Sequence, residues 1–409
     1  MMAQSSKRLS EYLESEIARG AFPGAQYVVG ERGQIIAEDA LGYAVVEPER
    51  IAATVDTIYD IASLTKPLVT SLLAIILSER GVIDLNAPIS DYLSEFKGEA
   101  GINDNRPITL KRLLTHTSGL PNWRPLYLEA ESPARVPAVI ARIATESREQ
   151  SSPLQLVYSD LNYILLGVAF ERATGERLDH LARREIFEPL DLKNTMFNPP
   201  PELKRRIAAT ERGQEFEQAN ALALIAESEN LKIGGGTSHA SPSYSSDMVQ
   251  SQSSPSLHAF STSAPRHAWR EDIIWGEVHD GNAYFMGGVS GHAGLFSTAR
   301  EVFRIADQVL QGSQLVKAVS LDLFTENLTP GFDTARSIGW ILASTKGCSA
   351  GPSLPPTVIG HNGFTGTSVW MDPGRRRMCV LLTNRVHPKV SAVDIKCVRQ
   401  RFNTLAMEE

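Results

Sequence analysis

A serine and a lysine three positions apart, Ser63 and Lys66, are the residues of this chain best suited to covalent chemistry. They stand at the start of an apolar run from Leu68 to Leu77, which predicts a buried helix. Residues three apart on a helix share one face. The lysine can therefore draw a proton from the serine or hold a neighbouring base, as a serine nucleophile needs. Alone, the pattern is also that of a solvated helix start, in which Ser63 only caps the helix.

Acyl transfer also needs a base and hydrogen-bond donors for the developing oxyanion. Tyr158 precedes Ser159 and Asp160 at the start of a periodic helix, and the run His-Asn-Gly-Phe at 361–364 lies near a predicted strand. A tyrosine with its ordinary pKa of about 10 is a poor base at neutral pH, so Tyr158 would need a cation beside it. A tyrosine packed in the core is the alternative interpretation.

Four segments, in this order and at wide spacing, resemble the β-lactamase-related serine hydrolase family. That family includes class C β-lactamases, D-alanyl-D-alanine carboxypeptidases and esterases of the same fold, and Ser-x-x-Lys is its first motif. The segments are Ser-Leu-Thr-Lys at 63–66, Leu-Leu-Thr-His-Thr-Ser-Gly-Leu-Pro at 113–121, Tyr-Ser-Asp at 158–160 and His-Asn-Gly-Phe-Thr-Gly at 361–366. The glycine-rich stretch 287–297 also resembles a family segment. The resemblance covers nearly the whole chain outside residues 212–268.

The resemblance implies a role for each segment. Ser63 would attack the carbonyl carbon, Lys66 and Tyr158 would form the base system, and the N–H groups of Ser63 and Phe364 would form the oxyanion hole. The helix dipole favours a nucleophile at a helix N-terminus. We expect burial to lower the proton affinity of Lys66, as a base or its partner requires. We also expect Gly363 to permit close backbone approach to the serine.

Two residues depart from the pattern of the family. His361 stands where class C β-lactamases carry lysine, and Asp160 stands where many members carry asparagine. Loss of a permanent positive charge weakens recognition of the carboxylate on β-lactams or D-alanyl-D-alanine termini. We expect His361 to donate a hydrogen bond and to become charged at mildly acid pH. The acidic Asp160 changes the local field and can favour different substrates.

Four further side chains are weaker candidates. His116, in the Thr-His-Thr-Ser-Gly loop, is expected to brace a turn. His279, Asp280 and His292 stand in glycine-rich loops that could border the cleft. For His292, a pocket-lining role and a structural role are equally open. His279 and Asp280 are too few for a metal site, and we expect no cofactor and no metal.

These residues need a scaffold of strands from both chain ends with helices between them. Alternating apolar residues predict strands at 25–30, 34–46, 337–343, 357–360, 367–371 and 378–384. Apolar periodicity predicts helices at 6–19, 63–80, 89–96, 109–115, 136–144, 161–174, 177–187, 300–310 and 391–406.

The expected fold class is α/β of the α+β type, a β-lactamase/transpeptidase-like fold in one catalytic domain, residues 1–409. An antiparallel sheet flanked by helices is formed from both chain ends, 1–80 and 291–409. A mostly helical part, 81–290, is inserted between them. The site would lie in the cleft between these two parts, where ligand sites often form.

Residues 212–268 shift in composition. A triple glycine at 234–236 and a serine-dense run predict a flexible insert without regular structure. Its histidines, His239, His258 and His267, are expected to be incidental. We expect removal of 215–265 to leave the fold intact.

The composition limits which binding partners and which cellular compartment we expect. A net charge of -7 argues against nucleic acid or an anionic membrane as partner. There is no apolar leader, and the longest apolar run is too short to span a bilayer, so we expect a cytoplasmic protein. The cysteines, Cys348, Cys379 and Cys397, are sparse and odd in number, which favours a reducing compartment without disulfides.

We therefore expect a serine hydrolase that cleaves an ester or amide bond through an acyl-enzyme on Ser63, acting on a small-molecule ester, amide or peptide. D-alanyl-D-alanine carboxypeptidase or β-lactamase activity is the alternative. A catalytically inactive binding protein of the same fold is a further one, which the presence of Ser63, Lys66 and Tyr158 argues against. The oligomeric state is left open.

Overall fold

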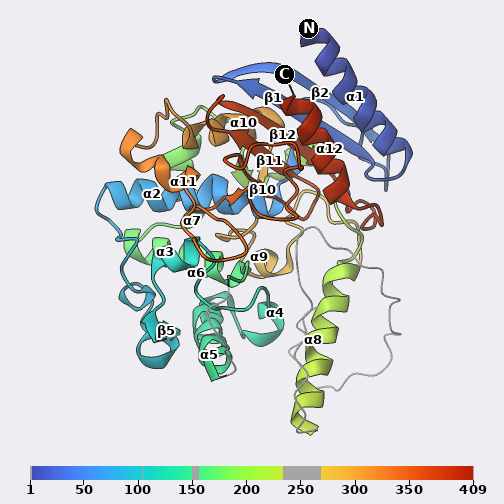
Figure 1. Cartoon of the computed structure of the whole chain (residues 1–409). Helices are drawn as coiled ribbons and strands as arrows, with labels where there is room; N and C mark the ends of the chain where they lie inside the picture. The colour runs from blue at the N-terminus through green and yellow to red at the C-terminus, as the bar shows by residue number, and fades with distance from the viewer. Residues whose placement is uncertain (1, 104, 150–155, 234–268, 409) are drawn as a thin grey trace.

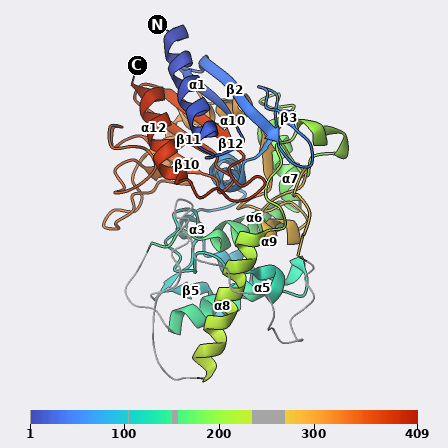
Figure 2. The same ribbon diagram turned by 90° about the vertical axis from the view of Figure 1, so that its right-hand side faces the viewer.

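The computed structural model describes residues 2–103, 105–149, 156–233 and 269–408. Figure 1 shows a sheet with flanking helices at the top and a mostly helical part below it. Figure 2, turned by 90°, shows the same two parts, with the long helix α8 (Glu215–Ile233) in front of the lower one.

Among the described residues, the largest sheet has seven strands in the order β3-β2-β1-β12-β11-β10-β9, all antiparallel. The strands are β1 (Gly24–Glu31), β2 (Gln34–Val45), β3 (Ile51–Ala52), β9 (Ile341–Leu342), β10 (Ile359–Asn362), β11 (Ser368–Asp372) and β12 (Arg377–Thr383). Strand β1 pairs with β12 from Ala25 opposite Thr383 to Glu31 opposite Arg377. The two ends of the chain therefore build one sheet, and this confirms the predicted fold class.

The two faces of the sheet pack against different helices because successive side chains of a strand point to opposite faces. On β1, Tyr27 and Val29 join a core formed with α1 (Met2–Ala18) and α12 (Ile395–Met407). Val28, between them, joins the larger core on the other face. That core includes α10 (Ala299–Ala306) and the helix that begins at Ala62.

The helix from Ala62 to Glu79 runs through the larger core. It begins as a 3₁₀ turn (Ala62–Leu64), widens into a π-helix (Lys66–Ser71) and continues as α2 (Leu72–Glu79). Pro67 stands in the first turn of the π segment, where its missing N–H removes a bond of a regular α ladder. Among the described residues this is the one helix long and apolar enough to cross a membrane, but 83% of it is buried inside the fold. It is the core helix of the molecule.

The part below the sheet contains the remaining helices and two small sheets. The helices are α3 (Leu110–Leu114), α4 (Leu126–Glu129), α5 (Val136–Glu149), α6 (Asp160–Thr174), α7 (Leu178–Ala182), α8 (Glu215–Ile233) and α9 (Gly281–Phe285), while α11 (Asp322–Thr325) lies nearer the C-terminus. The small sheets are β4 (Tyr59–Asp60) with β8 (Leu295–Ser297) and β7 (Met196–Phe197), and β5 (Ile102–Asn103) with β6 (Arg106–Pro107).

The prediction of an unstructured insert at 212–268 is wrong for its first part. Residues 215–233 form helix α8, because the segment is rich in Ala, Leu and Glu, which are strong helix formers. Ala221 is fully buried and packs with Trp123 and Tyr127. Residues 234–268, with His239, His258 and His267, lie outside the described residues.

Candidate active site

The turn before Ser63 aims its side chain into a pocket. Ala62 has a φ of +49°, a left-handed conformation that costs a residue with a Cβ free energy and is typical of functional turns. The buried carboxyl of Asp60 accepts the N–H of Ala62 at 2.8 Å and the N–H of His279 at 2.8 Å, which holds this turn in place. Ser63 itself is half-buried and lines the pocket.

Lys66 is completely buried, and three oxygen atoms surround its amino group. Its Nζ donates to Ser63 Oγ at 2.8 Å and to the carbonyl oxygen of His292 at 3.0 Å. It also forms an ion pair with Asp160 Oδ1 at 2.7 Å. An ammonium group has three donors and no acceptor. The three contacts therefore fit a protonated lysine.

The expected loss of proton affinity at Lys66 is wrong. Burial lowers the pKa of Lys66, but the nearby Asp160 and Tyr158 raise it, and the net pKa lies above its ordinary value. Asp160 is thus the counter-ion of the lysine.

The aromatic ring of Tyr158 lies between two cations. The Lys66 Nζ is 5.2 Å and the Arg336 Cζ 5.1 Å from the ring centroid. The hydroxyl of Tyr158 is buried and makes no hydrogen bond with any described residue. Arg336 is only 7% exposed.

His116 braces the segment that carries Tyr158, as expected of a turn residue. Its Nδ1 accepts the N–H of Ser159 at 3.0 Å, and its ring packs on that of Tyr158 with centroids 4.6 Å apart. Burial lowers the pKa of His116 well below its usual value. The ring is therefore neutral, as an acceptor at Nδ1 must be.

Strand β10 and the turn after it lie against the segment that precedes Ser63. A Cβ placed on Gly363 would be 2.5 Å from the carbonyl oxygen of Ile61, so only glycine fits there. The hydroxyls of Thr365 and Thr367 donate to the carbonyl oxygens of Asp60 and Ile61 at 2.8 and 3.0 Å. The expected close backbone approach at Gly363 is present.

The expectation that His361 becomes charged at mildly acid pH is wrong. Burial and the positive charges of Lys66 and Arg336 hold the pKa of His361 well below its usual value. Its Nδ1 lies 2.8 Å from the carbonyl oxygen of Asn362, which fits a neutral ring that donates from Nδ1. His361 is therefore no substitute for the positive charge of a lysine.

The pocket brings together most of the residues singled out in the sequence. Ser63, Tyr158, Asp160 and Phe364 line it, and so do His279 and Asp280. Its other lining residues come from the turn before Ser63, the loops 122–123 and 293, and helix α8: Ala62, Asn122, Trp123, Ala293, Phe216 and Glu217. Lys66, His292, His361 and Gly363 lie behind this surface.

His292 supports the pocket from behind. Its Nε2 lies 2.9 Å from Asp280 Oδ1 and its Nδ1 2.8 Å from Ser290 Oγ, while its carbonyl oxygen accepts from Lys66. These bonds lower the pKa of Asp280 against the effect of burial. Between the two roles left open for His292, the contacts favour the structural one.

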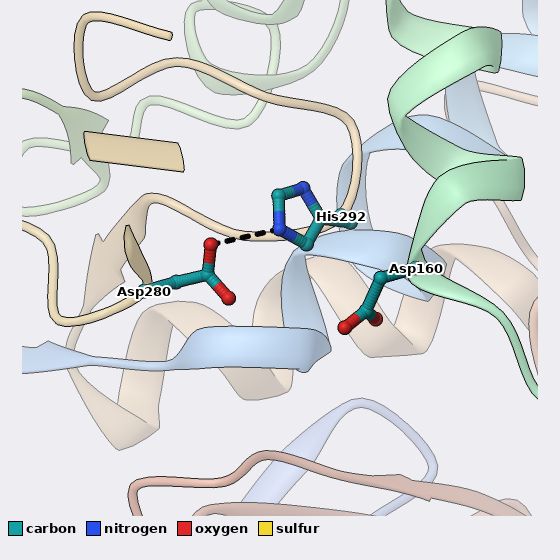
Figure 3. A group of neighbouring side chains, drawn as sticks. All are labelled: Asp160, Asp280 and His292. Atoms are coloured by element: carbon teal, nitrogen blue, oxygen red, sulfur yellow. Dashed lines mark hydrogen bonds and ion pairs between the residues drawn. The ribbon is translucent and has the colours of Figure 1, made fainter. Parts of the chain in front are cut away.

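The side chains of Asp160, Asp280 and His292 could in principle hold a metal ion. Their ligand atoms lie within 4.8 Å of one another, and Figure 3 shows both carboxylates turned toward the space between them. The ammonium of Lys66 is 2.7 Å from Asp160, and a cation here would meet this like charge. The donor set does not fit a resident metal.

Helix α8 contributes a residue that sequence reasoning missed. Glu217 is 6% exposed, and its carboxyl lies in the pocket wall. Burial and the charge of Asp280 raise the pKa of Glu217 to about 7. The helix-forming composition of 215–226 could have revealed α8. The position of Glu217 follows only from long-range packing. Removal of 215–265 would delete this part of the wall, and the expectation that the fold stays intact without these residues stays a prediction.

Comparison with known proteins agrees with this geometry. The family model described as Beta-lactamase matches residues 9–398. An N-acetylmuramyl-L-alanine amidase of Bacillus subtilis is 29% identical over 94% of this chain and 82% of the relative. A putative D-alanyl-D-alanine carboxypeptidase of Salmonella gallinarum is 28% identical over 95% and 84%. The crystal structure of a beta-lactamase from Sulfitobacter superposes with a TM-score of 0.67 at 19% identity, covering 100% of this chain and 98% of the other.

Proposed function

Because the chain belongs to the β-lactamase family of serine hydrolases, we propose that it cleaves an ester or amide bond through an acyl-enzyme on Ser63. The observation that carries this proposal is the contact of Ser63 Oγ with the buried ammonium of Lys66 at 2.8 Å, on the wall of a pocket that Tyr158 shares. The ammonium occupies a lone pair of Oγ. The hydroxyl proton of Ser63 is then free to point toward another base.

We assign that base to Tyr158, whose ring lies 5.2 Å from Lys66 Nζ and 5.1 Å from Arg336 Cζ. Ser63 Oγ attacks the carbonyl carbon while its proton passes to the Tyr158 oxygen. Tyr158 then gives this proton to the leaving amine or alcohol, and the acyl group stays on Ser63 as an ester. A water molecule attacks this ester, its proton passes to Tyr158, and Ser63 takes the proton back as the acid leaves.

The N–H groups of Ser63 and Phe364 are the proposed donors to the oxyanion. The hydrogen bonds of Thr365 and Thr367 support this assignment, because they tie the turn after β10 to the residues just before Ser63. Phe364 and Ser63 also line the same pocket.

An amidase or esterase fits the pocket better than a carboxypeptidase does. Among the described residues, no lysine or arginine lines the pocket, whereas Asp160, Glu217 and Asp280 do. A substrate that ends in a carboxylate would find no lysine or arginine on the pocket surface to pair with, and the neutral His361 offers no compensation. The relative named D-alanyl-D-alanine carboxypeptidase keeps that activity as the second candidate.

A panel of substrates tests the proposal. We expect p-nitrophenyl acetate and an amide without a terminal carboxylate, such as N-acetylmuramyl-L-alaninamide, to be hydrolysed faster than a peptide ending in D-alanyl-D-alanine, and Ser63→Ala to abolish every activity. Faster release of D-alanine than of the other products would favour the carboxypeptidase. The cytoplasmic location stays a prediction.

A further inference from the structure

Glu217 lies in the pocket beside Ser63, and the proposed hydrolysis does not use it. Its Oε2 accepts the N–H of Gly281 at 3.0 Å and the side-chain amide of Gln214 at 3.1 Å. The side chain of Tyr127, which lies beside Oε1, also hydrogen-bonds this carboxyl. A carboxylate has about four acceptor sites, so a ligand that brings a further donor can still bind to it.

The packing around Glu217 brings its carboxyl close to α9. A Cβ on Gly281, the first residue of α9, would be 2.2 Å from Glu217 Oε1 and 2.9 Å from Tyr127 Cε1. The absence of a side chain at this position lets the carboxyl of α8 lie beside Asp280, the residue that caps α9. Two carboxyl groups thus stand next to each other at the wall of one pocket.

Glu217 differs from the other carboxylates of this region in its partners. Asp160 pairs with Lys66, Asp280 with His292, and Glu211 with His279. Glu217 has no ion-pair partner among the described residues. Arg270, a nearby cation, contacts the carbonyl oxygens of Val278 and His279 and pairs with Glu277 at 3.5 Å. Since its pKa is about 7, Glu217 carries a negative charge without an ion-pair partner once the pH exceeds this value.

Aromatic side chains form another part of the pocket wall. Trp123, Phe216 and Phe364 line it, and the rings of Phe216 and Phe364 lie with centroids 5.1 Å apart. The face of an aromatic ring attracts a cation, most strongly where water is excluded. Carboxylates and aromatic faces together are suited to an ammonium group.

We propose that this pocket selects substrates whose acyl part carries a protonated amine, held by Glu217 and Asp280 against the aromatic wall. The acyl part becomes attached to Ser63 in the first step of the reaction and leaves it in the second. A binding site beside this serine can therefore hold the acyl part in both steps. One N–H of the ammonium donates to the carboxylate of Glu217 in a charge-assisted bond. This inference rests on the proposed function and names its substrate class.

Two substrates that differ only at the amine test the inference. Alanine p-nitroanilide and N-acetylalanine p-nitroanilide share the acyl chain and the leaving group, and both enantiomers are assayed. At a pH where the free amine is largely protonated, we expect kcat/KM of wild type to be about tenfold or more higher for the free amine, mainly through KM. We expect Glu217→Gln to remove most of this ratio. Glu215→Gln, an exposed residue of the same helix, should keep it.

A ratio of one or less in wild type, or an unchanged ratio in Glu217→Gln, would overturn the inference. If neither anilide is hydrolysed, a binding measurement tests the inference instead. Calorimetry with Ser63→Ala should show tighter binding of the free amine than of the acetylated compound, and Ser63→Ala/Glu217→Gln should lose this difference. Equal binding of both compounds overturns the inference. The proposed function fails separately, if no ester or amide gives turnover that depends on Ser63.

Discussion

Substitution of Glu217 by glutamine should change how the stability of the protein depends on pH. Burial and the neighbouring Asp280 raise the pKa of Glu217 from 4.5 to about 7, against smaller opposite effects of His279 and Tyr127. A carboxyl whose pKa is raised by folding binds its proton more tightly in the folded state. It therefore stabilises the fold fully below its unfolded pKa, and this contribution is lost as the pH rises through the folded pKa.

The size of the effect follows from the two pKa values. At about 1.4 kcal/mol per pKa unit, wild type loses about 3 kcal/mol of unfolding free energy between about pH 4 and pH 9 because of this group. Glutamine does not titrate. The stability of Glu217→Gln relative to wild type should therefore rise by about 3 kcal/mol over this range, whatever its value at low pH.

Urea unfolding, followed by circular dichroism at a series of pH values, measures this difference. Titrating groups that do not interact with Glu217 cancel when the variant is compared with wild type at each pH. Glu215→Gln is the matched control, because Glu215 is exposed on the same helix, and its difference from wild type should stay flat. A flat difference for Glu217→Gln as well would refute the reasoning, since it would mean that folding leaves the pKa of Glu217 unchanged.

Three further substitutions probe the site. Asp160→Asn removes the counter-ion of the fully buried Lys66 and should cost about 3 kcal/mol of unfolding free energy, measured in urea. Gly363→Ala places a Cβ 2.5 Å from the carbonyl oxygen of Ile61, so it should lower kcat on p-nitrophenyl acetate by about tenfold or more, because the turn after β10 must shift. His361→Asn should leave the shape of the pH–rate profile between about pH 5 and 8 unchanged, because His361 is neutral throughout.

Each of these expectations has a control and a contradicting result. Asp191→Asn alters a fully exposed carboxylate and should leave stability unchanged, and an equal loss in both variants would argue against the ion pair. Gly374→Ala, in the hairpin between β11 and β12, should keep full activity. A limb of the pH profile that disappears in His361→Asn would show that His361 titrates in this range.

The nucleophile motif and the burial of the core helix could be predicted from the sequence because both depend on residues that are close together in the chain. The spacing of Ser63 and Lys66 places them on one helical face, and the apolar run after them requires burial. These features need no knowledge of distant contacts. The pairing of strands from the two chain ends does not follow from their local pattern, and its prediction rests on the resemblance to the β-lactamase-related family.

Other features depend on contacts between distant segments, and the sequence did not reveal them. The proton affinity of Lys66 is decided by competition between burial and the charges of Asp160 and Tyr158, and only the folded structure gives its sign. Asp60 matters because its carboxyl reaches both Ala62 and His279. Arg336 lies far along the chain from Tyr158. Helix α8 was missed because the serine-rich run that follows it led us to predict the whole of 212–268 as unstructured.

Mass spectrometry of the protein, trapped during turnover, tests the central claim most directly. Wild type is mixed with a p-nitrophenyl ester of a slowly hydrolysed acyl group, quenched in acid and digested. We predict a mass increase equal to one acyl group, located on the peptide that contains Ser63 and absent in Ser63→Ala. An acyl group on another residue, or ester turnover that persists in Ser63→Ala, would contradict the assignment of Ser63 as the nucleophile.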